Sequence, residues 1–292
     1  MRVRFVPRKD LARVASADWV DHSRRPFVEG ESAWVPVLPG KPFDRDIIAP
    51  PEYAGRGYYV IGDIIVIHGN RPDPQEVRNL AERKKPRGIL WREALDDITR
   101  TPRTEVLFGT CGDTEHHESG FTYILDPSKV MFSQGNRNEK NRMADLIRQA
   151  GDHERVADMF AGIGYFTIPM AAAGSVVHAM EINPVACAYL RRNAVVNKLD
   201  TRIIVAEGDC RELITGTYDR IVMGHFDSLL FLSHALRHVT PGSIIHVHTV
   251  GTFEDTIRTT VEGAGFSCRI QVHKVKKYRP HAWHVVHDVT IA

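Results

Sequence analysis

The sequence has few cysteines and no long apolar run. Its four cysteines, Cys111, Cys187, Cys210 and Cys268, are spread along 292 residues. This spacing fits neither a disulfide framework nor a zinc ribbon and is typical of a reducing cytosol. No stretch of about 18 apolar residues is present, and residues 1–10 are charged where a signal peptide is apolar. We therefore expect a cytoplasmic protein without a membrane segment.

The sequence also lacks a large net charge. Its 38 Lys and Arg nearly balance 36 Asp and Glu, which gives a net charge of +2. This balance neither requires nor excludes a nucleic-acid partner, so any basic surface must be local. A hydrophobic content of 43% over this length is enough for one large domain or two ordinary ones.

The clearest local signal is a strand, a glycine turn and a helix within residues 155–173. Such a turn lets the backbone approach a ligand and directs the helix N-terminal N–H groups at it. The dinucleotide fingerprint places a third glycine where this sequence has Thr167, and Asp158 precedes Gly162 by four residues. The pattern D-x-x-x-G-x-G suits S-adenosylmethionine better than a dinucleotide, although an ordinary tight connection is the alternative.

Acidic residues follow three successive predicted strands, namely Asp158, Glu181 and Asp209. The carboxyl ends of parallel strands lie at one edge of a sheet, where an open α/β fold binds its ligand. Glu181 is placed to accept both ribose hydroxyls, and Asp209 lies where an adenine contact is expected. We therefore expect a cofactor at this edge.

After residue 155 the chain alternates regularly between strand and helix patterns. The predicted strands are 155–159, 176–181, 202–206, 218–224 and 243–249, and the predicted helices are 165–173, 184–197, 210–214, 228–238 and 254–263. This order predicts a parallel sheet covered on both faces. Residues 267–277 and 283–291 alternate in polarity and predict a closing antiparallel hairpin. The expected fold class is α/β, with the Rossmann-like sheet of the class I S-adenosylmethionine-dependent methyltransferases.

The first half of the chain is less regular. Prolines between residues 36 and 51 oppose long helices and indicate short strands. Further on, the patterns predict two strands within 58–68, a helix at 74–83, strands at 105–110, 120–125 and 129–133, and an amphipathic helix at 138–151. We predict three parts: a small α+β region at 1–85, a linking α+β domain at 86–150 and a cofactor-binding catalytic domain at 151–292.

Two groups of histidines invite a metal interpretation. His116 and His117 adjoin Glu118 in a predicted turn, but no third and fourth ligand lies nearby in sequence. His246 and His248 share one face of a predicted buried strand, where neutral, hydrogen-bonded imidazoles are the commoner state. We expect no metal site.

Several motifs together resemble a known family of tRNA-modifying enzymes. They are FSQGN at 132–136 with Glu139, Lys140 and Arg142 after it, DMFAGIGYFTIP at 158–169, EINPVACAYLRRNAVVNKL at 181–199 and GDCREL at 208–213. These segments resemble the enzymes that act on guanosine 37 of phenylalanine tRNA, and the resemblance covers roughly residues 90–292. One activity of that group is guanosine N1-methylation. The other belongs to wybutosine biosynthesis and moves the 3-amino-3-carboxypropyl group of S-adenosylmethionine onto 4-demethylwyosine.

One segment distinguishes these two activities. Methyltransferases of the group carry Asn-Pro-Pro-Tyr or Asn-Leu-Pro after the fourth strand, where the asparagine holds the target base. This sequence has Gly224, His225, Phe226 and Asp227 there. A similar glycine replacement is typical of the aminocarboxypropyl transferases, so the resemblance implies that activity, with methylthioadenosine as the leaving group. The alternatives are the tRNA guanosine-37 N1-methyltransferase and a catalytically inactive tRNA-binding protein.

The resemblance also implies a set of cofactor-binding residues. Lys140 or Arg142 is expected at the methionine carboxylate, Glu181 at the ribose, and Asp209 with the backbone of Cys210 at the adenine. The whole expected set is Ser133, Lys140, Asp158, Phe160, Ala161, Gly162, Glu181, Ile182, Asp209 and Cys210. Glu139 and His225 are candidate general bases, and neither is assigned as catalytic.

The partner that the resemblance implies is the anticodon loop of tRNA(Phe), bound by a monomer. The domain at 86–150 is then expected to contribute to tRNA binding. The most probable phosphate contacts from charge alone are the basic stretch 83–87, flanked by Trp91, and the cations of 273–279.

Overall fold

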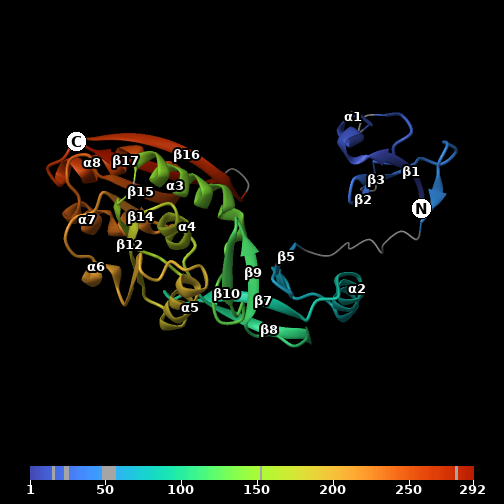
Figure 1. Cartoon of the computed structure of the whole chain (residues 1–292), viewed down its shortest axis with the longest axis horizontal. Helices are drawn as coiled ribbons and strands as arrows, with labels where there is room; N and C mark the ends of the chain where they lie inside the picture. Colours follow the sequence, from blue (N-terminus) through green and yellow to red (C-terminus); the bar gives the residue numbers. More distant parts are fainter. Residues whose placement is uncertain (15–16, 23–25, 48–56, 152, 280–281) are drawn as a thin grey trace. The chain divides into compact units, whose positions relative to one another are not determined.

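The computed structural model describes residues 1–14, 17–22, 26–47, 57–151, 153–279 and 282–292 (Figure 1). The chain divides into two compact units. The first contains residues 1–55 and 78–85, and the second contains residues 56–77 and 86–292. The division into three parts at residues 85 and 150 stays a prediction.

The first unit contains a small antiparallel sheet. Its strands are β1 (Arg2–Pro7), β2 (Phe27–Glu29), β3 (Ser32–Pro36) and β4 (Arg45–Asp46), in the order β2-β3-β1-β4. A 3-10 turn, η1 (Arg8–Asp10), and the short helix α1 (Leu11–Val14) follow β1. Val6, Val20 and Val35 form its small apolar core. Short strands are what the proline content predicts; Pro50 and Pro51 lie outside the described residues.

The second unit begins with a four-stranded sheet. Its strands, in spatial order, are β5 (Tyr58–Ile61), β6 (Ile64–His68), β7 (Gly88–Asp96) and β8 (Thr101–Gly109). Gly62 turns between β5 and β6 with a φ of 55°, which confirms the predicted break there. The helix α2 (Pro74–Lys84), of which residues 78–84 belong to the first unit, confirms the prediction at 74–83.

The strand β7 was not predicted. The basic residues before it and Trp91 indicate an exposed phosphate-binding stretch, yet Ile89 and Leu90 are fully buried in the sheet. The indole N–H of Trp91 donates to the carbonyl oxygen of Gly69 at 2.9 Å. Trp91 is therefore partly covered and anchored, so it is not a free stacking platform.

A two-stranded ribbon, β9 (Thr114–Glu118) and β10 (Phe121–Leu125), follows. The prediction that His116, His117 and Glu118 lie in a turn is wrong, because all three belong to β9. The predicted strand at 129–133 is also wrong. Asp126 accepts hydrogen bonds from the backbone N–H groups of Ser128 and Val130 and folds that segment into a turn. The turn leads into η2 (Gln134–Asn136) and the predicted amphipathic helix α3 (Arg137–Ala150).

A seven-stranded sheet forms the largest part of the second unit (Figure 1). Its order is β13-β12-β11-β14-β15-β17-β16; the first five strands are parallel and the last two antiparallel, as predicted. The strands are β11 (Arg155–Asp158), β12 (Val176–Glu181), β13 (Ile203–Glu207), β14 (Arg220–Met223), β15 (Ile244–Val250), β16 (Cys268–Arg279) and β17 (Ala282–Ile291). Residues 280 and 281 of the predicted hairpin turn lie outside the described residues.

Helices cover both faces of this sheet. They are α4 (Thr167–Ala172), α5 (Pro184–Val196), α6 (Cys210–Leu213), α7 (Leu232–Ala235) between the 3-10 turns η3 (Ser228–Phe231) and η4 (Leu236–His238), and α8 (Glu254–Gly263). The predicted helix at 228–238 is thus divided into three short pieces. The neighbours Val156 and Ala157 of β11 belong to different apolar clusters, one packed with α3, α4 and α5 and the other with α7 and α8. Burial on both faces is the requirement of a parallel sheet.

A buried polar network joins the sheet to α3. His246 lies 2.6 Å from Asp288 through Nδ1 and 2.6 Å from Arg220 through Nε2. Arg142 donates to Asp288 at 2.5 Å, and His248 pairs with His284 at 2.9 Å. These histidines are therefore held by hydrogen bonds. Among the described residues, no group of three or more His, Cys, Asp or Glu side chains is arranged to hold a metal ion, and no helix is long and apolar enough to cross a membrane.

Candidate cofactor pocket

The glycine turn after β11 requires its two glycines. Gly162 has a φ of 56° and Gly164 a φ of 102°, both in the left-handed region. A Cβ atom on Gly162 would lie 2.9 Å from the Tyr165 ring, and one on Gly164 would lie 2.7 Å from a methyl of Leu190. The backbone therefore passes close to its neighbours here, and any side chain at either position strains the turn.

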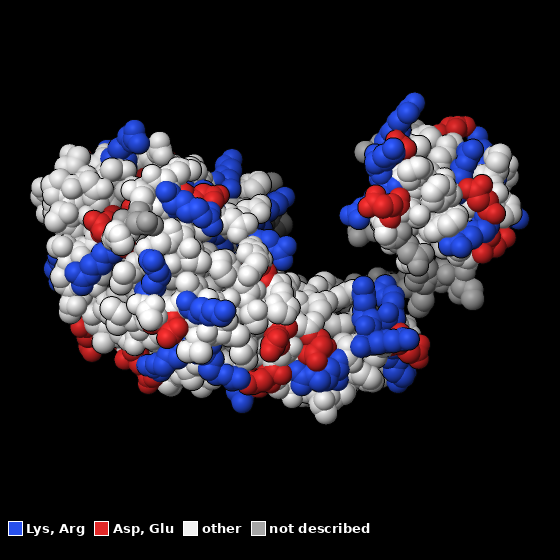
Figure 2. Space-filling model, viewed as in Figure 1, with Lys and Arg blue, Asp and Glu red and all other residues white. Residues whose placement is uncertain are grey.

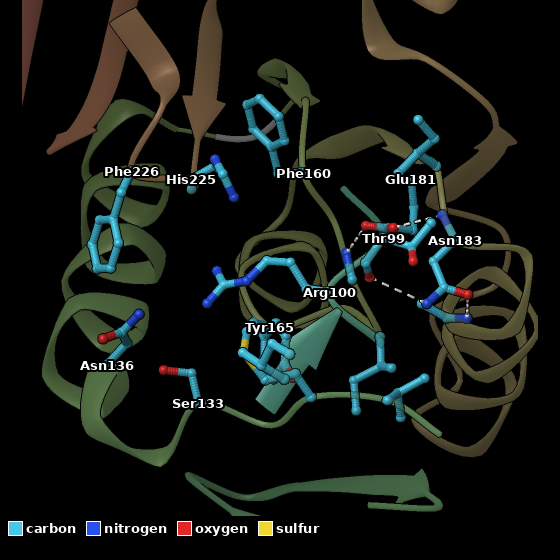
Figure 3. Close-up of a pocket in the computed structure, with 18 of the residues that line it drawn as sticks. Thr99, Arg100, Ser133, Asn136, Phe160, Tyr165, Glu181, Asn183, His225 and Phe226 are labelled. Atoms are coloured by element: carbon cyan, nitrogen blue, oxygen red, sulfur yellow. Dashed lines mark hydrogen bonds between the residues drawn. The ribbon is translucent and has the colours of Figure 1, made fainter. Parts of the chain in front are cut away.

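Glu181, at the end of β12, lies beside this turn. The backbone N–H of Gly162 donates to its Oε2 and that of Asn183 to its Oε1, both at 2.8 Å. Burial is the largest cause of a raised pKa at Glu181, and these two hydrogen bonds oppose it. Figure 3 shows Glu181 and Asn183 together on one side of the pocket. Each carboxylate oxygen still has a lone pair for a ribose hydroxyl.

Asp158 supports the turn from below. It is completely buried, its Oδ2 accepts from the Thr167 hydroxyl at 2.7 Å, and its Oδ1 accepts from the Phe160 N–H at 3.4 Å. Burial raises its pKa to about 6. Neither Asp158 nor Ala161 lines the pocket; both are buried in the protein next to residues that do.

The other eight predicted cofactor residues come together around one cavity of about 1090 Å³. They are Ser133, Lys140, Phe160, Gly162, Glu181, Ile182, Asp209 and Cys210. The cavity lies at the carboxyl ends of β11, β12, β13 and β14, where an open parallel sheet binds its ligand. It is lined by both acidic and aromatic groups and is large enough for a nucleoside with an attached amino-acid arm.

The side of the pocket expected to bind adenine is formed after β13. Asp209 caps the first turn of α6 by accepting the Arg211 N–H at 2.9 Å, and its side chain also pairs with the Arg211 guanidinium. This side-chain pairing is the largest cause of the lowered pKa of Asp209. Phe160 and Phe231 form an edge-to-face pair with ring centroids 5.1 Å apart, which supplies an apolar surface beside it.

The two cations expected at the methionine carboxylate are already paired. Lys140 Nζ lies 2.5 Å from Glu118, and the side chains are 2% and 1% exposed. Burial opposes ionisation of Glu118, but the neighbouring His116, Lys140 and Arg137 side chains lower its pKa to about 2. Arg142 does not line the pocket, because it binds Glu139 and Asp288. Lys140 therefore reaches the pocket already ion-paired, through a carboxylate that it shares with Arg137.

The two candidate general bases have different surroundings. Glu139 is 4% exposed, binds Arg142 through both oxygens and does not line this pocket. His225 lines it, with its ring stacked on Phe160 at 5.4 Å and Nδ1 accepting the Asp227 N–H at 3.2 Å. Burial first, and Arg100 second, lower the pKa of His225, so the ring is neutral near pH 7.

Arg100 is a pocket residue that the sequence did not indicate. It lies in the turn between β7 and β8, and its guanidinium points toward the side of the pocket lined by Asn136 and Phe226 (Figure 3). Thr99 in the same turn accepts a hydrogen bond from the Asn183 amide at 3.4 Å. Because the sequence analysis did not predict β7, it could not place the β7–β8 turn beside the pocket. No local sequence signal marks Arg100.

The fold and the pocket are those of an S-adenosylmethionine-dependent transferase. The TRM5/TYW2 methyltransferase domain family matches residues 114–274. The chain is 33% identical over 246 residues to the tRNA(Phe) (4-demethylwyosine(37)-C(7)) aminocarboxypropyltransferase of Methanocaldococcus jannaschii, covering 80% of this chain and 97% of that protein. The chain therefore belongs to the TRM5/TYW2 family.

Solved structures agree with this assignment. The structure of Pyrococcus horikoshii TYW2 in complex with MeSAdo is 29% identical, with a TM-score of 0.69, over 80% of this chain and 90% of that one. The complex of aTrm5 and tRNALeu reaches a TM-score of 0.74 over 100% of both chains at 21% identity, which shows the fold alone.

Replacement of Glu181 by alanine is expected to weaken S-adenosylmethionine binding on the order of 10- to 100-fold, because hydrogen bonds to a charged group contribute about 1.5–3 kcal/mol. Isothermal titration calorimetry measures this change. Glu207 is the matched control, since it pairs with Glu181 in register on β13 but does not line the pocket. Equal affinities for Glu181→Ala and Glu207→Ala would remove Glu181 from the site.

Asp158→Asn is expected to change the pH dependence of stability. The folded pKa of Asp158, about 6, lies above its ordinary value near 4, so folding favours the protonated carboxyl. Ionisation therefore lowers the free energy of unfolding as pH rises from about 4 to about 6, by at most roughly 3 kcal/mol. The amide stays neutral, so the variant should gain stability relative to wild type across this window. Urea denaturation at several pH values tests this; a pH-independent difference would contradict it.

Proposed function

We propose that this protein transfers the 3-amino-3-carboxypropyl group of S-adenosylmethionine to 4-demethylwyosine at position 37 of tRNA(Phe) and releases methylthioadenosine. When bound, the sulfonium supplies the electrophilic γ-carbon: its bond to sulfur breaks as a bond to C7 of the base forms, and C7 loses a proton. The cytoplasmic location, the monomeric state and the anticodon-loop contact are parts of the same proposal.

The observation that carries the proposal is Gly224. It follows β14 at the pocket wall, where a base-holding asparagine is expected in a methyltransferase of this group. A Cβ atom at this position would lie 3.2 Å from the Phe166 ring, so even a small side chain crowds the wall. Which carbon of a sulfonium reacts depends on which one lies in line with the nucleophile. Because Gly224 has no amide side chain, this wall cannot hold the base by a hydrogen bond from that position. It leaves room for the methionine arm instead.

The residues around Gly224 support a desolvated acceptor site. Phe226 lies beside Tyr278 and His284, with centroids 5.0 Å away in both cases. His225, kept neutral by burial, has an acceptor nitrogen only while its other nitrogen carries the proton. It is the titratable side chain next to Gly224, and we propose that its Nδ1, once released from the Asp227 N–H, receives the C7 proton directly or through water.

A basic surface on α2 supports tRNA binding. Lys84 and Lys85 are exposed at the end of this helix, and Figure 2 shows Lys and Arg side chains gathered over it. Arg87 differs from its neighbours, because its guanidinium binds Asp63 at 2.7 and 3.1 Å. Within the basic stretch 83–87, Lys84 and Lys85 are therefore the cations available for phosphates.

Lys84→Glu with Lys85→Glu is expected to weaken tRNA affinity and to make its dependence on salt less steep, because fewer counterions are released on binding. Filter binding at several salt concentrations measures both quantities. Each single α2 variant is compared with Lys198→Glu, at an exposed lysine after α5, which makes the same change in net charge. If the α2 variant loses no more affinity than this control, the surface is not a tRNA contact.

The proposed activity is tested by identifying the small-molecule product. The protein is incubated with S-adenosylmethionine and tRNA(Phe) carrying either 4-demethylwyosine or unmodified guanosine at position 37, and the products are analysed by mass spectrometry. We expect methylthioadenosine from the 4-demethylwyosine tRNA alone. S-adenosylhomocysteine from the guanosine tRNA would identify a guanosine N1-methyltransferase and overturn the proposal.

A further inference from the structure

Two of the cations that line the pocket have no ion-pair partner among the described residues. Lys140 pairs with Glu118, Arg211 pairs with Asp209, and Arg92 donates to the Tyr59 hydroxyl at 2.9 Å. The remaining lining cations are Lys276 and Arg100. Neither has an ion pair or a side-chain hydrogen bond to another residue of the described ranges. Both cations are therefore available to an anionic group of a ligand.

An irregularity in β16 directs Lys276 to the pocket. The register with β17 shifts between Lys274, which pairs with Val285, and Lys276, which pairs with His284. In a regular ladder, Val275 would occupy the place opposite His284. The extra residue is a β-bulge, a device that re-aims a side chain and is frequent beside active sites. As a result Lys276 and His284 both line the cavity.

The 3-10 turn η2 is shaped to receive the Lys276 ammonium. A Cβ atom on Gly135 would lie 2.6 Å from Lys276 Nζ, so the ammonium occupies the space that any larger residue would fill. The next residue, Asn136, also lines the pocket, and its Oδ1 is buried without a hydrogen-bond partner among the described residues. A buried acceptor without a donor is rare in folded proteins and indicates a missing ligand. An unpaired ammonium next to Gly135 and an unpaired acceptor on the following residue thus line the same pocket.

We propose that Lys276 binds the α-carboxylate of the methionine arm of S-adenosylmethionine and that the Asn136 amide accepts a hydrogen bond from its α-ammonium. An amino-acid zwitterion has the charges that match this pair, with an anion for the lysine and a donor for the amide. This assignment rests on the proposed function for the choice of ligand. It replaces Lys140 and Arg142, which are neutralised by Glu118, Glu139 and Asp288.

The clamp holds the far end of the group that is transferred. In a methyltransferase that end stays with the leaving group, whereas here it moves to the base. Fixing the carboxylate and the ammonium leaves the γ-carbon between this clamp and the ribose site at Glu181. Burial, and Lys140 next, lower the pKa of Lys276, so a bound carboxylate also stabilises its charged form.

The test compares three ligands with the same nucleoside: one with the complete arm, one whose arm lacks the carboxylate, and one without the arm and without the sulfonium charge. Isothermal titration calorimetry of wild type and Lys276→Met is carried out with S-adenosylmethionine, decarboxylated S-adenosylmethionine and methylthioadenosine. We expect a loss on the order of 10- to 100-fold for S-adenosylmethionine, with methylthioadenosine affinity unchanged and with the preference over the decarboxylated ligand abolished. Lys277→Met, at the next residue of β16, is the matched control and should bind all three ligands as wild type does.

Two further variants make the result decisive. Gly135→Ala keeps the lysine but pushes its flexible end away, so it should reproduce part of the loss for S-adenosylmethionine alone. Arg100→Met addresses the other unpaired cation. A carboxylate-specific loss in Arg100→Met but not in Lys276→Met would overturn the proposal, as would an equal loss for all three ligands. Loss of tRNA affinity alone in Lys276→Met would make it a phosphate contact and overturn it too.

Failure of this proposal is distinguishable from failure of the proposed function. The calorimetry reports ligand binding and does not depend on which group is transferred. Product analysis of the wild-type protein decides the reaction separately. Methylthioadenosine from wild type together with unchanged binding in Lys276→Met would overturn the clamp and leave the transferase activity in place.

Discussion

The buried ion pair between Glu118 and Lys140 is the interaction on which the pocket depends. It joins β9 to α3, and three aromatic rings, of Tyr123, Phe132 and Tyr165, lie within 6 Å of the ammonium. Breaking such a pair by removing one partner leaves a buried charge and typically costs about 3–5 kcal/mol. The pair occupies Lys140 with a carboxylate inside the protein, although Lys140 also lines the cavity. The need for a free cation in the pocket is therefore met from another strand.

The opposite side of the pocket is organised by carboxylates with separate tasks. Asp158 lies under the glycine turn and holds its backbone, whereas Glu181 lies beside the same turn with its oxygens at the pocket surface. Both are buried enough for their pKa to rise, yet only one is exposed to a ligand. The D-x-x-x-G-x-G pattern thus combines an aspartate that holds the turn with a glycine backbone that lies at the pocket. The acid that lines the pocket, Glu181, comes from the next strand.

The sequence predicted most of the large sheet because its periodicities are local. Strand ends, glycine positions and the closing hairpin follow from residue patterns, and they place Glu181 and Asp209 at the pocket. The features that were missed depend on distant partners. Lys140 has a carboxylate partner 22 residues away on a strand that reads as a turn. Lys276 and Arg100 reach the cavity through a bulge and through the β7–β8 turn, neither of which has a local signature.

The bulge at Val275 has an evolutionary consequence. Strand residues alternate between faces, so one inserted residue exchanges the side chains that each face presents beyond it. Gain or loss of such an insertion changes what faces the pocket without altering any residue at the cofactor's nucleoside end. Two enzymes of one family can thus differ in the ligand group that they bind because a bulge changes which strand residues face the pocket. A comparison that aligns their β16 residues position by position, without a gap, would hide the difference.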